Sequence, residues 1–120
     1  MLKTIGLFKR RPGMSVEEFR AYYESTHRVI GEKYLKGHAE RYVRRFLDPF
    51  PDRYTGEDVE PDFDVLLEIW YADREAYDAT RAILRDPETA KEIAEDEEKL
   101  FDRESIRFFT VEEHESDLTA

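Results

Sequence analysis

The sequence predicts an α+β fold with the element order β-α-β-β-α-β, a ferredoxin-like arrangement whose four-stranded antiparallel sheet carries its helices on one face. Three observations predict it: an early turn followed by a capped helix, a strongly apolar strand over residues 63–71, and two helical stretches before a last strand. We expect a single domain over residues 1–112 and an acidic, frayed tail over residues 113–120.

The first strand is predicted over residues 2–9, where apolar residues occupy both alternate sets, as in a strand covered on two sides. Pro12 and Gly13 then turn the chain. Ser15 and Glu18, three residues apart, form a capping box that opens a helix.

This helix is expected to end between Gly31 and Gly37, since glycine weakens its later turns. It carries one apolar and aromatic stripe, with His27 near the edge. The stripe consists of Val16, Phe19, Tyr23, Thr26, Ile30 and Tyr34.

Two more strands follow. Residues 40–47 alternate charged with apolar or aromatic side chains and predict a more exposed strand. Residues 48–62, with three prolines, predict a long loop that lines or covers a site. The strand over residues 63–71 is wholly apolar at its odd positions, and its even positions are Asp64, Leu66, Glu68 and Trp70.

The last third predicts two helices and a strand. Asp73 caps a helix that runs to about Leu84, and Asp86 with Pro87 starts the next one. The inner face of that second helix is predicted to consist of Ala90, Ile93, Ala94, Glu97 and Phe101. A final strand is predicted over residues 105–111.

The strand over residues 63–71 is apolar on both faces, yet the helices can cover only one face of the sheet. Its other face needs a partner, and face-to-face packing of two identical subunits supplies it most simply. We therefore expect a homodimer through the sheet face.

The composition excludes several classes of protein. With 29 acidic and 19 basic residues, the formal charge is −10, so we expect no binding to nucleic acid or to anionic membranes. The absence of cysteine excludes disulfides, thiolate metal sites and thiol nucleophiles. No apolar run is long enough for a membrane span, so we expect a soluble, cytoplasmic protein.

The candidate catalytic residues are His27, Glu68 and Tyr23. His27 is a general acid or base if partly buried beside a carboxylate, or a structural histidine that hydrogen-bonds a strand or loop. Glu68 and Asp64 project side by side from one strand face, where a buried carboxylate suits proton transfer. The structural alternative is an ion pair with Arg41 or Arg44 on the neighbouring strand, or, for Asp64, a place at the solvated strand end.

Aromatic side chains are candidates for binding a planar, apolar substrate. Tyr23 shares the stripe of His27 and can donate a hydrogen bond to a substrate oxygen. Tyr22, Tyr42 and Trp70 are candidate substrate-binding residues, with Asp64 beside them; the alternative is that such rings simply fill the core, which is the stronger reading for Phe8 and Trp70.

No metal site is expected. His38, His27 and Glu68 have the composition of a two-histidine, one-carboxylate set, but their spacing contains no local ligand pair. No glycine-rich phosphate loop is present either, which disfavours a nucleotide site.

Two stretches resemble the EthD family. Residues 9–15 (Lys-Arg-Arg-Pro-Gly-Met-Ser), with Glu18-Phe19 and the spacing of Tyr22-Tyr23 to His27, look like the opening signature of that family. Residues 68–71 (Glu-Ile-Trp-Tyr) are similar to its later strand motif. The resemblance covers roughly residues 3–111 in matching element order.

The resemblance implies a dimeric α+β barrel with a cavity between helices and sheet, and it places His27 at the position of the family's helix histidine. Related barrels include cofactor-free monooxygenases, polyketide cyclases, dehydratases, decarboxylases and isomerases. One departure is that Arg28 and Val29 follow His27, where family members commonly have a small residue and proline.

These observations favour a small-molecule enzyme with no cofactor that moves protons on a hydrophobic, aromatic or polyketide-like ligand. Such an enzyme would be a lyase or isomerase rather than an oxidoreductase. His27 would be the base or acid, Glu68 its partner and Tyr23 a donor. Two alternatives remain: a cofactor-free monooxygenase or accessory subunit of an oxygenase, and a non-catalytic binder of a hydrophobic ligand.

Overall fold

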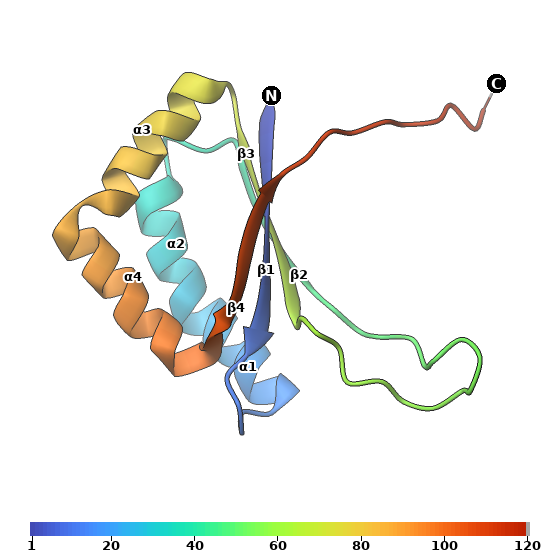
Figure 1. The fold of residues 1–120 in the computed structure, drawn as a ribbon. Coiled ribbons are helices and arrows are strands. Elements are labelled where there is room, and N and C mark those ends of the chain that lie inside the picture. Colours follow the sequence, from blue (N-terminus) through green and yellow to red (C-terminus); the bar gives the residue numbers. More distant parts are fainter. Residues whose placement is uncertain (120) are drawn as a thin grey trace.

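All helices lie on one side of a single antiparallel sheet (Figure 1), in a computed structural model that describes residues 1–119. The strand order is β2-β3-β1-β4, the order of the ferredoxin-like fold. The strands are β1 (Leu2–Arg10), β2 (Arg41–Phe46), β3 (Val65–Tyr71) and β4 (Phe101–Thr110). The predicted α+β, ferredoxin-like class is confirmed.

Three helices cover the sheet. The first is continuous and consists of α1 (Val16–Tyr22), a π-helical turn η1 (Tyr23–His27) and α2 (Arg28–Leu35). The other two are α3 (Arg74–Arg85) and α4 (Pro87–Leu100). None of the helices in the described part of the chain is long and apolar enough to cross a membrane.

The predicted helix starts are confirmed by their caps. The Ser15 side chain accepts a hydrogen bond from the Glu18 backbone N–H at 3.0 Å, and the Glu18 carboxylate accepts one from the Ser15 N–H at 3.2 Å. Asp73 caps α3 through the Ala76 N–H at 2.8 Å. Pro87 stands in the first turn of α4, where its missing N–H costs nothing.

Phe101 begins β4, so its predicted place on the inner face of the last helix is wrong. The helix ends at Leu100, whose carbonyl accepts a hydrogen bond from the Arg11 N–H at 2.7 Å. Phe101 then pairs with Arg10 and packs its ring 4.6 Å from that of Phe8. Because the chain passes from helix to strand without a loop, no turn residue marks the boundary.

The two faces of β3 meet different surroundings. Val65, Leu67, Ile69 and Tyr71 are buried under the helices. Leu66, Glu68 and Trp70 alternate with them and face the other side of the sheet, which no described helix covers (Figure 1).

The connection between β2 and β3 extends away from the helices (Figure 1). It is tied down near its ends, where Lys9 pairs with Glu60 at 2.5 Å and Arg20 pairs with Asp48 at 2.9 Å. Residues 111–119 form no helix or strand, and Ala120, the last residue of the predicted tail, lies outside the described residues.

Asp64 fixes the turn into β3 and is buried, with 4% of its surface exposed. Its carboxylate accepts hydrogen bonds from the Arg10 backbone N–H at 2.8 Å and from Arg10 Nη1 at 2.6 Å, and Lys9 Nζ lies 3.5 Å away. Asp64 therefore joins β1 to β3.

We expect Asp64→Ala to lower the free energy of unfolding by about 3 kcal/mol, because the partly buried Arg10 guanidinium loses its buried ion-pair partner and the Arg10 backbone N–H loses its acceptor. Urea unfolding followed by circular dichroism measures it. The matched control is Asp62→Ala, at an exposed residue of the same segment. Equal stability of the two variants would contradict this role.

Candidate active site

The π-helical turn brings Tyr23 and His27 onto the face of the first helix that meets the sheet. The Arg28 N–H donates to the Tyr23 carbonyl, five residues back, so this turn is wider than an α-helical one. Residues four apart then keep the same direction, and Phe19, Tyr23, His27 and Leu35 are all buried. Such turns often occur at functional sites.

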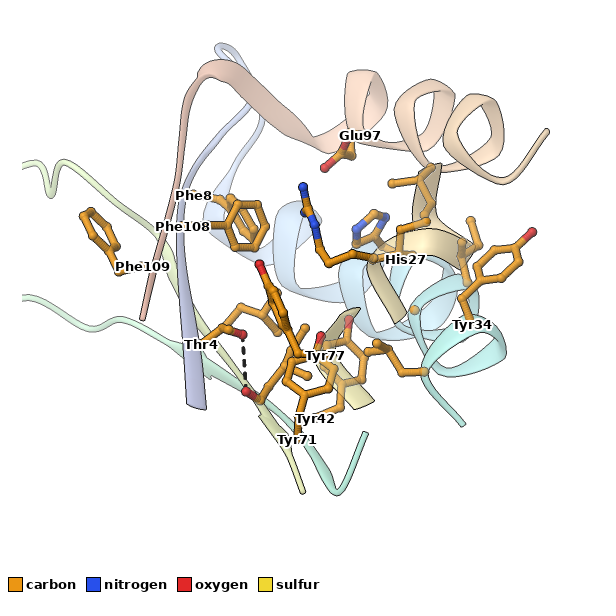
Figure 2. A pocket seen from close by; sticks show the side chains of 18 of the residues that line it. Thr4, Phe8, His27, Tyr34, Tyr42, Tyr71, Tyr77, Glu97, Phe108 and Phe109 are labelled. Atoms are coloured by element: carbon orange, nitrogen blue, oxygen red, sulfur yellow. Dashed lines mark hydrogen bonds between the residues drawn. The ribbon is translucent and has the colours of Figure 1, made fainter. Parts of the chain in front are cut away.

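A cavity of about 300 Å³ lies between the helices and the sheet. Its walls are mostly apolar and aromatic, and Figure 2 shows the rings of Tyr42, Tyr71 and Tyr77 grouped on one side of it. The lining residues are Thr4, Phe8, Tyr23, His27, Ile30, Gly31, Tyr34, Leu35, Tyr42, Leu67, Ile69, Tyr71, Tyr77, Arg81, Leu84, Ile93, Glu97, Phe108, Phe109 and Thr110.

His27 lines this cavity and is held by Asp96 of α4. His27 Nδ1 lies 2.8 Å from Asp96 Oδ2, and the Tyr22 hydroxyl donates to Asp96 Oδ1 at 2.5 Å. Asp96 is buried, with 5% of its surface exposed. The rings of Tyr23 and Phe101 meet the imidazole edge-on, at centroid distances of 5.1 and 5.3 Å. Hydrogen bonds and packing together fix the orientation of the imidazole.

The environment keeps His27 neutral. Burial lowers the pKa of His27 below its ordinary 6.5, and the hydrogen bond and charge of Asp96 oppose this shift only in part. A neutral imidazole beside a carboxylate places its proton on Nδ1, which leaves the lone pair on Nε2. Nε2 has no hydrogen-bond partner within residues 1–119 and is not sealed from the cavity. It is therefore free to accept a proton.

Tyr22 stays protonated and donates a hydrogen bond to Asp96. Burial, with the hydrogen bond and charge of Asp96, raises the pKa of Tyr22 to about 12. The phenol therefore remains a donor throughout the neutral range and leaves the second oxygen of Asp96 to His27.

The Tyr23 hydroxyl is sealed from solvent and has no hydrogen-bond partner of good geometry within residues 1–119. Burial, and then its interaction with Tyr42, raises its pKa well above 10.0. A buried hydroxyl without a well-formed hydrogen bond is costly, and the neighbouring Tyr42 phenol is close enough to complete one after a small movement.

Tyr42 reaches the cavity past Gly31. A Cβ atom at position 31 would lie 2.7 Å from the Tyr42 hydroxyl, closer than such atoms approach. Gly31 therefore provides the space in which the Tyr42 side chain lies against α2.

Glu97 also lines the cavity, from the α4 position next to Asp96 (Figure 2). Burial raises the pKa of Glu97 above 4.5; the charge of Arg103 opposes the shift and that of Asp96 adds to it. Glu97 is thus a second carboxyl group at the cavity, and its burial favours the protonated form.

The structure brings together three of the predicted site residues: His27, Tyr23 and Tyr42. Tyr22 does not line the cavity but binds Asp96. None of residues 48–62 lines the cavity, so the loop predicted to line or cover a site does not line this one.

Glu68, Trp70 and Asp64 lie elsewhere. Glu68 projects from the opposite face of the sheet and forms an ion pair with Arg45. It is therefore not the partner of His27. The alternation along β3 explains this, since Ile69 and Leu67 face the cavity and their neighbours cannot.

Trp70 shares that outer face, where Lys3 Nζ and the Arg41 guanidinium stack on its ring at 3.8 and 4.5 Å. Asp64 has the structural ion pair with Arg10 already described. Neither is a residue of the cavity.

The sequence prediction missed Asp96, and gave Glu97 an inward position but no role. Asp96 stands in an acidic run of α4, which is typical of a solvated face. The available signal was its spacing from Thr89, Ile93 and Leu100, which places all four on one helical stripe. No group of three histidine, cysteine or acidic side chains within residues 1–119 could hold a metal ion.

Comparison with known proteins gives a family and a fold. The sequence model of the EthD domain matches residues 11–104. No curated protein matches the chain. The crystal structure of At3g17210 from Arabidopsis thaliana is similar, with a TM-score of 0.61 and 14% identity over 98% of this chain and all of that one. At that identity the likeness concerns the fold alone.

We expect the His27 pKa to fall further in an Asp96→Asn variant, because burial remains while the anion that favours the imidazolium is lost. Nitrogen-15 NMR of the imidazole measures both the pKa and the tautomer. In the wild type, the proton at neutral pH should reside on Nδ1. A wild-type pKa above 6.5, or a rise in the variant, would contradict this electrostatic arrangement.

The lowered pKa of His27 also makes the free energy of unfolding depend on pH. The pKa of His27 is below 6.5 in the folded chain. Neutral His27 therefore makes its full contribution to the free energy of unfolding above pH 6.5, and this contribution is lost as the pH falls below that value. The wild type should therefore lose more stability than His27→Gln between pH 7 and mildly acidic pH.

Proposed function

The chain belongs to the EthD domain family, and from this membership and the His27–Asp96 pair in an apolar cavity we propose an enzyme that moves a proton on a small molecule. It needs no bound cofactor for this step. The substrate is an apolar, aromatic or polyketide-like compound with a carbonyl group, and the reaction is a decarboxylation, dehydration, cyclisation or isomerisation.

The single observation that carries this proposal is the hydrogen bond from His27 Nδ1 to Asp96. It leaves Nε2 as the base and stabilises the imidazolium that forms when Nε2 takes a proton. Loss of a proton from carbon beside a carbonyl leaves an enolate, whose charge lies largely on oxygen. The imidazolium then returns the proton to another position of the substrate.

Tyr23 supports the same step. Its ring meets the His27 imidazole edge-on, and a small shift of the neighbouring Tyr42 phenol would let its buried hydroxyl donate to the oxygen on which charge develops. The raised pKa of Tyr23 keeps this donor protonated during the reaction. Tyr42, across the cavity wall at Gly31, is positioned to contribute a second phenol.

We expect catalysed exchange of hydrogen for deuterium at the carbon beside the carbonyl of apolar ring ketones, with 2-tetralone as the first probe, followed by mass spectrometry in D₂O. His27→Gln should lower the rate about 10²- to 10⁴-fold, the usual contribution of a positioned base. Asp96→Asn should also lower it. His38→Gln, at an exposed histidine, is the matched control.

Unchanged exchange in His27→Gln would contradict the assignment of the base. Saturable binding of the ketones without exchange would indicate a non-catalytic binder of hydrophobic ligands instead. Oxygen consumption that depends on the ligand would indicate the oxygenase alternative.

We also propose that the uncovered face of the sheet packs against a second copy of the chain. Ile5 and Leu7 of β1 lie beside Glu68 and Leu66 of β3 on this face, and Phe109 of β4, which also borders the cavity, lies beside Ile5. These apolar side chains remain partly exposed, and Phe109 exposes 50% of its surface. An apolar face of this kind is typical of an interface between subunits.

We therefore expect a homodimer in analytical ultracentrifugation, and mainly monomers for Leu66→Glu, because a dimer interface would bury the new carboxylate. Val29→Glu, at an exposed position of α2 on the opposite side of the sheet, should leave the dimer intact. A wild type that sediments as a monomer at tens of micromolar would contradict this proposal.

A further inference from the structure

The cavity contains one cationic side chain among the lining residues that the structure describes, Arg81 of α3. Tyr77, Arg81 and Leu84 follow one another at helical spacing, and all three line the cavity. Arg81 therefore belongs to the same cavity wall as Tyr77 and Leu84.

Arg81 has neither an ion pair nor a hydrogen bond within residues 1–119. Three arginines of the sheet have an acidic partner: Arg10 with Asp64, Arg44 with Glu24, and Arg45 with Glu68. Arg81 is an exposed residue that reaches the edge of an apolar cavity without such a partner. Its five N–H donors are available to a ligand.

No acidic group that lines the described cavity or adjoins it forms an ion pair with Arg81. Asp96 is bound to His27 and Tyr22. The charges that act on Glu97 come from Arg103 and Asp96, and burial favours its neutral form. Arg81 therefore keeps its N–H donors available to an anionic ligand.

Tyr71 adds a donor near this charge. Arg81 is close enough for its charge to act on the Tyr71 phenol, although burial prevails and raises the pKa of Tyr71 to about 12. The phenol therefore stays protonated, and Arg81 and Tyr71 together present N–H and O–H donors to the same part of the cavity.

We propose that the substrate is an apolar ring compound that carries one carboxylate, and that Arg81 binds this carboxylate as a specificity-determining residue. A guanidinium binds a carboxylate through two parallel hydrogen bonds, which fixes orientation as well as charge. This inference rests on the proposed function, because it concerns the substrate class of the same cavity.

The inference also narrows the reaction. Decarboxylation moves charge from the carboxylate to carbon, so a cation at the carboxylate stabilises the ground state more than the transition state. Loss of the carboxylate held by Arg81 is therefore disfavoured. Isomerisation, dehydration and cyclisation are compatible with an anchored carboxylate, because that group keeps its charge throughout.

Calorimetric titration with 2-naphthoate and with neutral 2-naphthamide, which has the same ring system, tests the proposal on the full chain. The wild type should bind the carboxylate about 10- to 100-fold more tightly than the amide, the usual contribution of a hydrogen bond to a charged group. Arg81→Gln should abolish this preference and leave the affinity for the amide unchanged. Arg85→Gln, at an exposed position of α3 outside the cavity, is the matched control.

Equal affinity of the wild type for the two ligands, or binding of neither, overturns the inference. A preference for the carboxylate that survives in Arg81→Gln also overturns it. His27→Gln separates this result from the proposed function: it should keep the preference for 2-naphthoate over 2-naphthamide while losing hydrogen exchange. Exchange that is independent of His27, together with a preference dependent on Arg81, would reject the catalytic proposal and leave the substrate class standing.

Discussion

The hydrogen bond between His27 and Asp96 joins the last helix to the first at the wall of the cavity. Both groups are buried, and a buried carboxylate is tolerated only when its oxygens find donors. Tyr22 and His27 supply one donor each, both from the first helix. The requirement to satisfy Asp96 therefore fixes how α4 lies against η1, and the same bonds orient the imidazole in the cavity. Packing and site geometry depend on one carboxylate.

The fold was largely predictable from the sequence because its signals are local. The capping box at Ser15, the aspartates before α3 and α4, and the apolar alternation of β3 each act within a few residues. The boundary at Phe101 escaped prediction because the chain enters β4 directly from α4, with backbone pairing in place of a turn.

The site was predictable only in part. His27, Tyr23 and Tyr42 lie on elements whose inward faces show in the periodicity. The partner of His27 comes from a residue 69 positions away, and spacing along the chain contains no information on such a contact. Glu68 was the more conspicuous carboxylate because it interrupts an apolar strand, yet the side-chain alternation of β3 directs it to Arg45. Asp96 was hidden in an acidic run that also contains the exposed Glu95 and Glu98.

The close approach of Gly31 to Tyr42 has a consequence for how the cavity can change over evolution. The wall at this place consists of a backbone and a phenol in contact, with no side chain of α2 between them. A methyl group added at position 31 would displace the Tyr42 ring. The volume of the cavity at this position therefore changes in one step rather than gradually. Descendants of this chain could thus switch between ligands of different bulk by one nucleotide change, without altering the histidine, its carboxylate or the arginine of α3.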